Sequence, residues 1–410
     1  MHVVKVGAGR WAHARAVLAA FACVAAYLAM AAQPAFAANE KSKIDSAIRT
    51  AFKTNDINAV IVQVTVKGKT VIKKAYGESI TGVPATTDMH FRNGNVVAPF
   101  MSTLLLKLVE RGKVKLHDPI SKFVPGLFDG DKVTLGTLAG MTSGYEDYVR
   151  SADFPPLLYA NPFANFSTNK QLEIGRARTT IQFKPGAFFA YAHTNYVILG
   201  LALEKITGLK LETALSREVL RPLGLRNTVA SQTAAIPEPV LHTFSSERRG
   251  FLGVPDGQPF SEETTFWNPS WSFARGSVET STIEDLTRGA IGIGEGKLLS
   301  QRSYRLQIAP RVGLGKGYPD ACGNCRELKT AAGYGLGVFR NGPWIAAQPL
   351  LAGLGSVAAY LPSKRISIAV TVALGPGAYG DNGIPIGYHI KLYEAIGKIV
   401  APNDPPPPTS

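Results

Sequence analysis

The chain has 410 residues, a formal net charge of +14, and 45% hydrophobic and 18% charged residues. These fractions are those of a globular protein and exclude a disordered chain, and the length allows one large domain or two lobes. No run of lysine and arginine is interleaved with aromatic residues, so the sequence predicts no nucleic-acid partner.

The N-terminus has the pattern of a signal peptide, which we place at residues 1–37. A basic segment precedes an apolar run over residues 16–32, and Ala35-Phe-Ala37 is a small-x-small cleavage site. An uncleaved membrane anchor is the alternative, which is disfavoured because the run is alanine-rich and shorter than about 20 residues. We therefore predict an exported protein, periplasmic, secreted or wall-associated, with no stable membrane span after cleavage.

Cleavage would remove three basic residues and lower the net charge from +14 to +11 (14 − 3). Such an excess would favour anionic surfaces such as cell-wall polymers or lipid head groups, but a generally basic, soluble surface is the favoured explanation.

Two cysteines remain after cleavage, Cys322 and Cys325, in the sequence Cys-Gly-Asn-Cys. An even count in an exported protein favours a disulfide. Redox chemistry of the thioredoxin type needs a strand before the motif and a helix after it, whereas the flanking residues are typical of loops. Zinc would require four ligands, and no histidine is close in the sequence. A local disulfide is the favoured interpretation.

The N-terminal part of the mature chain predicts a helix and a hairpin. Hydrophobic spacing indicates a helix over residues 40–54, and alternation indicates strands over 59–66 and 70–75, joined by a turn at 67–69.

The stretch Phe91-Arg-Asn-Gly-Asn-Val-Val-Ala-Pro-Phe100 opens the most regular helix of the sequence. Its apolar residues follow the i, i+3, i+4 spacing of a buried face, and Gly112 is placed to end it. Asn95 is a candidate N-cap, and Pro99 is tolerable near the first turn. Asn95 and Ala98 are therefore expected on one face of the first turn.

The middle of the chain contains several motifs between irregular segments. Ser167-Thr-Asn-Lys170 matches Ser-x-x-Lys, but its context predicts a helix cap rather than a nucleophile. Ser143 also fits a turn or cap. Trp267 and Trp271 lie in a loop-rich segment and are expected to line a cleft or to pack in the core. A helix with a capping box is predicted from Ser281.

The C-terminal part returns to strands, at residues 334–340, 356–361 and 366–374. A closing helix follows over 386–400, and residues 401–410 form a proline-rich tail. Strands and helices at both ends around a helical middle predict an α+β fold.

Four segments carry a family resemblance: residues 91–125, Val133 to Gly144, Phe183 to Gly200, and Arg221-Pro-Leu-Gly-Leu-Arg-Asn-Thr228. Together they resemble the serine β-lactamase and penicillin-recognising family, which includes D-alanyl-D-alanine carboxypeptidases and related esterases. The resemblance implies a single domain over residues 38–400, with an antiparallel sheet flanked by terminal helices (about 40–80 and 334–400) and an inserted, mainly helical lobe (about 91–300).

The resemblance also assigns the site residues. Members of the family place Ser-x-x-Lys where this chain has Asn95 and Ala98. The second motif falls on Tyr191-Ala-His193, with the tyrosine retained and His193 in the asparagine position. The third motif falls on Ala347-Gln-Pro349, where the usual basic residue and glycine are missing, in a register that could slip by one residue.

These assignments predict a non-catalytic relative that binds a peptide, a cell-wall fragment or a protein partner and needs no cofactor or metal. The alternative is a working esterase, amidase or D-Ala-D-Ala-type hydrolase with an unconventional nucleophile or a water activated by Tyr191 and His193. For His193 itself, a wall residue hydrogen-bonded to a loop is favoured over a general base, and His117 is also interpreted as a loop residue.

Overall fold

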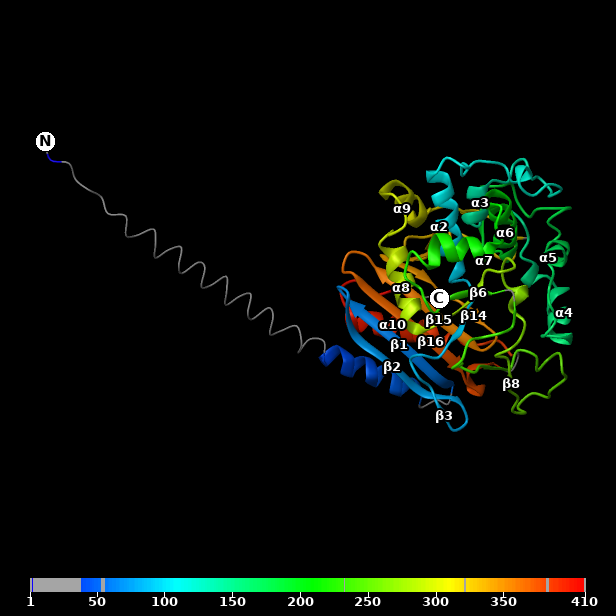
Figure 1. Ribbon diagram of the computed structural model, residues 1–410. Helices are drawn as coiled ribbons and strands as arrows, with labels where there is room; N and C mark the ends of the chain where they lie inside the picture. The colour runs from blue at the N-terminus through cyan, green and yellow to red at the C-terminus, as the bar shows by residue number, and fades with distance from the viewer. Residues whose placement is uncertain are drawn as a thin grey trace.

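The computed structural model describes residues 38–52, 56–231, 233–320, 322–380 and 383–408, together with residue 2. Apart from residue 2, the predicted signal peptide lies outside the described residues. An antiparallel sheet lies beside a lobe of helices and loops (Figure 1). Within the described ranges, no helix has the length and apolar character needed to cross a membrane. This is the predicted α+β architecture.

The main sheet has nine strands in the order β11-β12-β13-β15-β16-β1-β2-β3, with β14 paired to β15, and every pairing is antiparallel. Its strands are β1 (Ile57–Val66), β2 (Lys69–Ile80), β3 (Val83–Pro84), β11 (Gly333–Tyr334), β12 (Phe339–Asn341), β13 (Trp344–Ala347), β14 (Leu350–Leu351), β15 (Leu354–Leu361) and β16 (Ile366–Leu374). The two ends of the chain therefore build one sheet.

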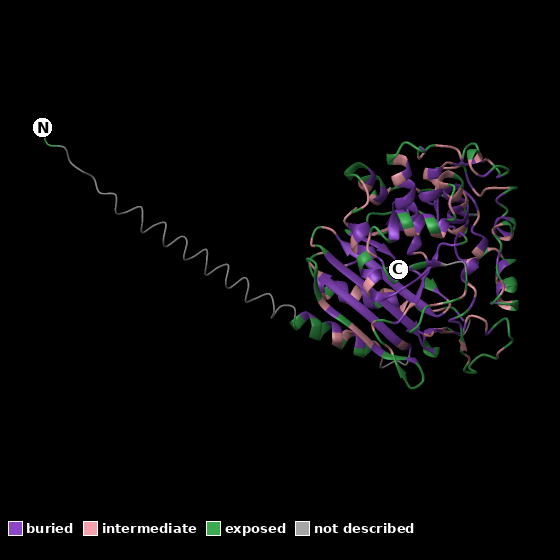
Figure 2. Cartoon of the chain, in the orientation of Figure 1, coloured by how far each residue is buried: buried purple, intermediate pink, exposed green. Residues whose placement is uncertain are grey.

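Both faces of the sheet are buried, which its side-chain alternation explains (Figure 2). Val60, Val62 and Val64 pack with a first helix (residues 38–51) and with α10 (Tyr388–Val400). Alternate positions, including Ala59 and Ile61 of β1, face the helical lobe instead. The sheet is thus the middle layer between the terminal helices and the lobe.

The lobe surrounds one buried helix, α2. The remaining helices are α3 (Leu135–Ala139), α4 (Phe154–Ala160), α5 (Thr168–Ile174), α6 (His193–Thr207), α7 (Leu211–Leu215), α8 (Ile283–Gly294) and α9 (Gln301–Ile308). Helix α2 spans Val97–Glu110 and is buried along most of its length, and Gly112 ends it with a positive φ of 68°, as predicted.

Short strands support the lobe. They are β4 (Phe91–Asn93), β5 (Phe189–Ala190), β6 (Val229–Ser231), β7 (Phe244–Ser245), β8 (Glu262–Glu263), β9 (Val278–Ser281) and β10 (Cys325–Arg326). They form a three-stranded sheet, β4-β9-β6, and the pairs β5–β10 and β7–β8. The sequence pattern missed these strands because each has only two to four residues.

Two predicted elements are wrong in detail. The strand predicted at 334–340 is a hairpin of β11 and β12, because the chain reverses at Gly337, where an added Cβ would lie 2.5 Å from the Ala98 carbonyl oxygen. The capping box predicted from Ser281 is absent. Thr282 is the N-cap of α8 without a side-chain cap, and Asp285 instead accepts a hydrogen bond from the Asn227 N–H at 2.6 Å.

The proline-rich C-terminal segment, as far as residue 408, lies against the sheet and α10. The Trp344 indole N–H donates to the Asp404 carbonyl at 2.9 Å, and Lys364 forms an ion pair with the Asp404 carboxylate at 2.9 Å. An added Cβ at Gly397 would lie 2.2 Å from Pro406, so α10 has a glycine where this segment crosses it.

Candidate binding site around Asn95 and Tyr191

A tight turn between β4 and α2 positions the first predicted site residue. The turn contains Gly94, where an added Cβ would lie 3.0 Å from the Pro349 Cβ. Glycine therefore allows the turn to approach the segment 347–349. The first and third motifs, about 250 residues apart in the sequence, are neighbours in the fold, as the resemblance implied.

Asn95 does not cap the helix, contrary to the prediction. The N-cap is Val96, which has no side-chain cap. The Asn95 amide Nδ2 instead donates to the Tyr191 hydroxyl at 3.1 Å, and its buried Oδ1 has no partner among the described residues. Its side chain is thus directed to the second motif and away from its own helix.

Ala98 lies in the first turn of α2, and its backbone N–H donates to the Asn95 carbonyl at 3.0 Å. It is buried, with 3% of its surface exposed. A methyl group there provides neither a base nor a hydrogen-bonding group, so the pair Asn95 and Ala98 contains no hydroxyl and no amine.

Tyr191 lies between β5 and α6, and its ring stacks on Phe339 of β12 with centroids 5.9 Å apart. Burial raises the pKa of the Tyr191 hydroxyl, and the nearby Asp147 carboxylate raises it further, whereas the hydrogen bond from Asn95 opposes the shift. The side chain is therefore a neutral phenol at neutral pH, and it cannot act as a phenolate base.

His193, the first residue of α6, is bound to a carboxylate that the sequence analysis missed. Its Nδ1 lies 3.0 and 3.2 Å from the two carboxylate oxygens of Asp147, and its backbone N–H donates to the same carboxylate at 3.1 Å. Asp147 is buried and also caps the turn at Tyr148–Arg150 through the Val149 N–H. The favoured interpretation of His193, a residue bonded to a loop, agrees with this geometry.

Asp147 was overlooked because it lies in an irregular segment, residues 145–167, for which the sequence offered no periodicity. The one available signal was its position three residues after Gly144, close to a motif already recognised. The Tyr191 and His193 rings meet edge to face with centroids 5.5 Å apart, so Asp147, His193, Tyr191 and Asn95 lie in one continuous row.

Three other serines, Ser102, Ser143 and Ser167, are engaged in hydrogen bonds of their own. Ser102 on α2 is fully buried and shares a 2.9 Å hydrogen bond with the Tyr196 hydroxyl. Ser143 accepts from the Tyr145 N–H at 3.1 Å, and Ser167 caps α5 by accepting from the Lys170 N–H at 3.2 Å. Ser143 in a turn and Ser167 as a cap confirm the two predictions.

The third predicted motif begins at Ala347, the last residue of β13. Ala347 is buried, and the side-chain Nε2 of Gln348 is a buried donor without a partner among the described residues. His117, interpreted from the sequence as a loop residue, lies in an exposed turn after α2, beside a separate surface pocket. Within the described residues, no group of three or more His, Cys, Asp or Glu side chains could hold a metal ion.

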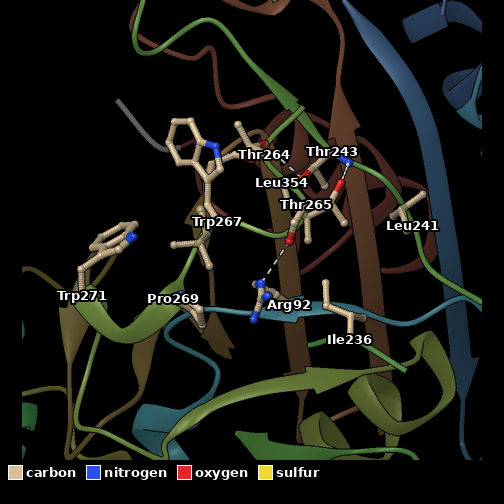
Figure 3. Close-up of a pocket in the computed structure, with 12 residues that line it drawn as sticks. Arg92, Ile236, Leu241, Thr243, Thr264, Thr265, Trp267, Pro269, Trp271 and Leu354 are labelled. Atoms are coloured by element: carbon tan, nitrogen blue, oxygen red, sulfur yellow. Dashed lines mark hydrogen bonds between the residues drawn. The ribbon is translucent and has the colours of Figure 1, made fainter. Parts of the chain in front are cut away.

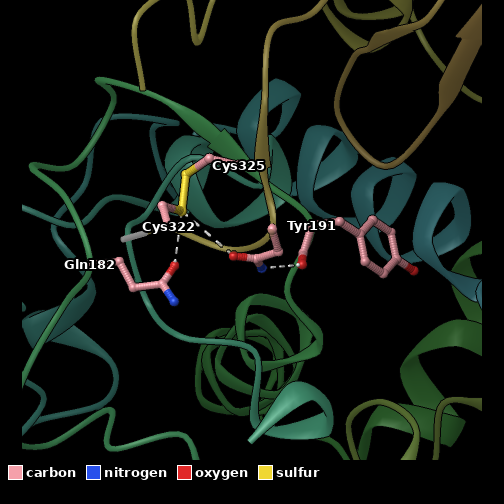
Figure 4. Close-up of a disulfide and its surroundings, with 5 residues drawn as sticks. Gln182, Tyr191, Cys322 and Cys325 are labelled. Carbon is pink, nitrogen blue, oxygen red and sulfur yellow. Dashed lines mark hydrogen bonds between the residues drawn. A yellow bond between two sulfur atoms is a disulfide. The ribbon is translucent and has the colours of Figure 1, made fainter. Parts of the chain in front are cut away.

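The cysteines form the predicted disulfide, Cys322–Cys325, and this disulfide lies beside the site (Figure 4). Between them, the side chain of Asn324 donates to the Tyr191 carbonyl at 2.9 Å. Cys325 pairs with Ala190 across β10 and β5, and the Arg326 guanidinium lies over the Phe189 ring at 5.1 Å. The disulfide-closed turn, Cys322–Cys325, therefore supports β5, the strand that immediately precedes Tyr191.

Comparison with known proteins identifies the family. The family model described as Beta-lactamase matches residues 44–383, which is most of the chain. The protein belongs to the beta-lactamase family.

Curated relatives of this beta-lactamase family member match part of it. Protein flp of Staphylococcus aureus is 24% identical over 204 residues, and a putative D-alanyl-D-alanine carboxypeptidase of Salmonella heidelberg is 28% identical over 165 residues. These matches cover 48% and 38% of this chain, and 39% and 38% of the two relatives.

Solved structures share the fold over longer stretches. A D-amino acid amidase from Ochrobactrum anthropi superposes with a TM-score of 0.72 at 17% identity, over 88% of this chain and 99% of that one. A D-stereospecific amidohydrolase from Streptomyces gives 0.67 at 22% identity, over 82% and 95%, and a penicillin-binding protein homologue from Pyrococcus abyssi gives 0.69 at 20%, over 89% and 79%. These likenesses confirm the predicted fold.

Proposed function

We propose that this beta-lactamase family member is an exported, non-catalytic binding protein whose ligand contacts the partly exposed residues Asn95, Tyr191 and His193. One observation carries the proposal: the amide of Asn95 donates to Tyr191 at the start of α2, the position at which the resemblance would place a serine. Export rests on the predicted signal peptide.

Chemistry argues against an acyl-enzyme at this site. A carboxamide is a poor nucleophile, and a serine in its place would still need a base to take its proton. Ala98 supplies none, and the raised pKa of Tyr191 keeps its proton in place. Loss of one member of such a catalytic unit typically lowers the rate by about 10³–10⁶.

The ligand we favour is a peptide ending in a D-amino acid, as in cell-wall fragments. The support is the naming of the relatives: a putative D-alanyl-D-alanine carboxypeptidase and a D-amino acid amidase crystallised with D-phenylalanine. The row from Asp147 to Asn95 offers such a peptide the phenol of Tyr191 and the imidazole of His193, both partly exposed.

Incubation with a fluorescent penicillin tests the absence of covalent chemistry. We expect no labelled band for the protein and a labelled band for the double variant Asn95→Ser with Ala98→Lys, since the variant restores a hydroxyl and an amine one helical turn apart. A stoichiometric adduct on the unmodified protein would overturn the proposal.

Calorimetric titration with a peptide ending in D-Ala-D-Ala tests binding. We expect Tyr191→Phe to weaken binding about tenfold, as is typical for one lost hydrogen bond, and the L-Ala-L-Ala peptide to bind more weakly than its D isomer. If the heat of injection is the same for both peptides and shows no saturation, peptides ending in a D-amino acid are excluded as the ligand.

A hydrolase that uses a water activated by His193 is the second candidate, because one observation favours it. Asp147 binds Nδ1 of His193, and a carboxylate in this position orients the imidazole and fixes its tautomer in general-base sites. This candidate predicts turnover of small esters that disappears in His193→Ala and falls strongly in Asp147→Asn. Background hydrolysis that is identical in all three proteins would exclude it.

A further inference from the structure

A second part of the structure, separate from the Asn95–Tyr191 pair, contains a buried positive charge without a negative partner. Arg92 of β4 is only 7% exposed. Its Nε donates to the Thr265 carbonyl at 3.4 Å and one Nη2 N–H donates to the Ala234 carbonyl, but Nη1 is buried and has no partner among the described residues. Arg92 is therefore held by neutral carbonyl groups alone.

Among the described residues, no carboxylate offsets this charge. Burial lowers the pKa of Arg92 to about 10, so the guanidinium remains protonated at neutral pH, and no acidic side chain contributes to the shift. The acidic residues nearest in sequence to Thr265 are Glu262 and Glu263, and each has its own partner, Arg248 at 2.9 Å and His242 at 2.6 Å. A buried, unpaired cation is costly, and an anion beside it would remove most of that cost.

A cavity lies at this position (Figure 3). In Figure 3, Arg92 extends from β4 toward Thr265, with Trp267 and Pro269 on one side and Ile236 and Leu241 on the other. The cavity has a volume of about 20 Å³, which accommodates roughly one water-sized group. An organic acid with a ring or a chain is too large, whereas a monatomic anion fits.

The cavity offers a second donor. The Thr265 hydroxyl accepts from the Thr243 N–H at 2.9 Å, and its own proton has no acceptor among the bonds found in the described residues. The hydroxyls of Thr243 and Thr264 are bonded to each other at 3.1 Å, and Thr264 donates to the Ala352 carbonyl at 2.6 Å. The available groups are thus N–H and O–H donors, beside a positive charge and apolar walls.

We propose that this cavity is a halide site, occupied by chloride under physiological conditions and held by Arg92 Nη1 and the Thr265 hydroxyl. The anion would join β4 to the loop that carries residues 264–271. Because β4 leads through Gly94 directly into Asn95, the halide would stabilise the base of the proposed binding site without contacting its ligand. The inference does not depend on the proposed function.

Bromide provides a direct test on the unmodified protein. Crystals soaked in bromide should show one anomalous peak within hydrogen-bonding distance of Arg92 Nη1, and iodide should quench the fluorescence of Trp267 and Trp271 along a saturable curve. A water molecule at this position, with no anomalous signal and only linear, collisional quenching, would overturn the proposal.

Matched variants extend the test. Arg92→Lys keeps the charge but removes Nη1, so we expect halide affinity to fall at least about tenfold, as for one hydrogen bond to a charged group. Arg249→Lys is the control. Arg249 is about as buried, at 8% exposed, and it also donates to backbone carbonyls, those of Pro255 and Gln258, but unlike Arg92 it has no nitrogen among the buried donors without a partner in the described residues.

The melting temperature in chloride and in gluconate of equal ionic strength gives an independent readout. It should be higher in chloride for the unmodified protein and for Arg249→Lys, and the same in both salts for Arg92→Lys. Equal chloride dependence in both variants would contradict the assignment. If Arg92→Lys does not fold, the bromide result still decides.

Discussion

Two antiparallel strand pairs of this protein are built in opposite ways. The β1–β16 pair has nine registered positions, from Ile57↔Leu374 to Val66↔Ile366, and most of its side chains are apolar and buried. The β4–β9 pair has three, Phe91↔Ser281, Arg92↔Thr280 and Asn93↔Glu279, and it buries a cation and a carboxyl group.

The comparison indicates that the apolar pair stabilises the fold, whereas the polar pair does not. In β1–β16, hydrophobic burial on both faces supplies the free energy that holds the layers together. In β4–β9, Glu279 is fully buried with neither oxygen partnered among the described residues, and the Asn93 Oδ1 opposite it is also unpaired. Such groups destabilise a fold. Asn93 lies in β4, the strand that leads to the proposed site, and Glu279 lies in the neighbouring strand β9.

The largest expected effect is in the apolar pair. Ile368 of β16 is fully buried opposite Val64. Ile368→Ala should lower the free energy of unfolding by about 2–5 kcal/mol, because it leaves a cavity between the sheet and the terminal helices. Urea denaturation measures this, and Ile368→Val should cost only about 0.5–1.5 kcal/mol. An equal loss in both variants would mean that this layer is not close-packed.

A substitution in the polar pair should raise the free energy of unfolding instead of lowering it. Burial raises the pKa of the Glu279 carboxyl well above its ordinary 4.5. Between the two values the folded protein binds more protons than the unfolded chain, so the contribution of Glu279 to stability falls as pH rises from about 4.5. Glu279→Gln removes this dependence. The stability of the variant relative to the unmodified protein should therefore rise with pH, by up to about 1.4 kcal/mol per pH unit.

Paired urea titrations between pH 4 and pH 8 give the difference between the two proteins. Other carboxyl groups with raised pKa values, such as Glu247, are present in both and cancel. A constant difference across the range would show that Glu279 titrates normally.

Sequence reasoning succeeded where periodicity alone determines the structure. Strand β16 was predicted with its observed bounds, and the buried face of α2 and the glycine that ends it were predicted from spacing. These features depend on neighbours along the chain or on simple burial.

Sequence reasoning failed where a segment distant in the sequence determines the partner of a side chain. Asn95 was predicted to cap its own helix, but its amide bonds to Tyr191, 96 residues away. Asp147 and the role of Arg92 were missed for the same reason, since their partners come from elements that the sequence does not place beside them. The family resemblance brought Asn95, Tyr191 and His193 together only because it carries three-dimensional information.

The Cys322–Cys325 disulfide tests whether a covalent bond also stabilises the region around the proposed site. Replacing both Cys322 and Cys325 by serine releases a four-residue loop and should lower stability by about 2 kcal/mol. The loss should appear in thermal unfolding, and a reducing agent should produce it in the unmodified protein. The double variant should in contrast be insensitive to the reductant. A reductant effect of equal size on the variant would mean that the disulfide is not its target.

The smallest expected effect isolates a single contact from this disulfide-closed turn to the site. Asn324→Ala removes the hydrogen bond to the Tyr191 carbonyl and should cost about 1 kcal/mol. The matched control is Gly323→Ala, because a Cβ at Gly323 meets nothing within 4 Å. Hydrogen exchange should then accelerate about fivefold at the amides of residues 189–193 in Asn324→Ala only, since 1 kcal/mol corresponds to that factor. If both variants exchange like the unmodified protein, the stacking of Tyr191 on Phe339 is sufficient to hold the ring, and the disulfide-closed turn contributes to stability without positioning the site.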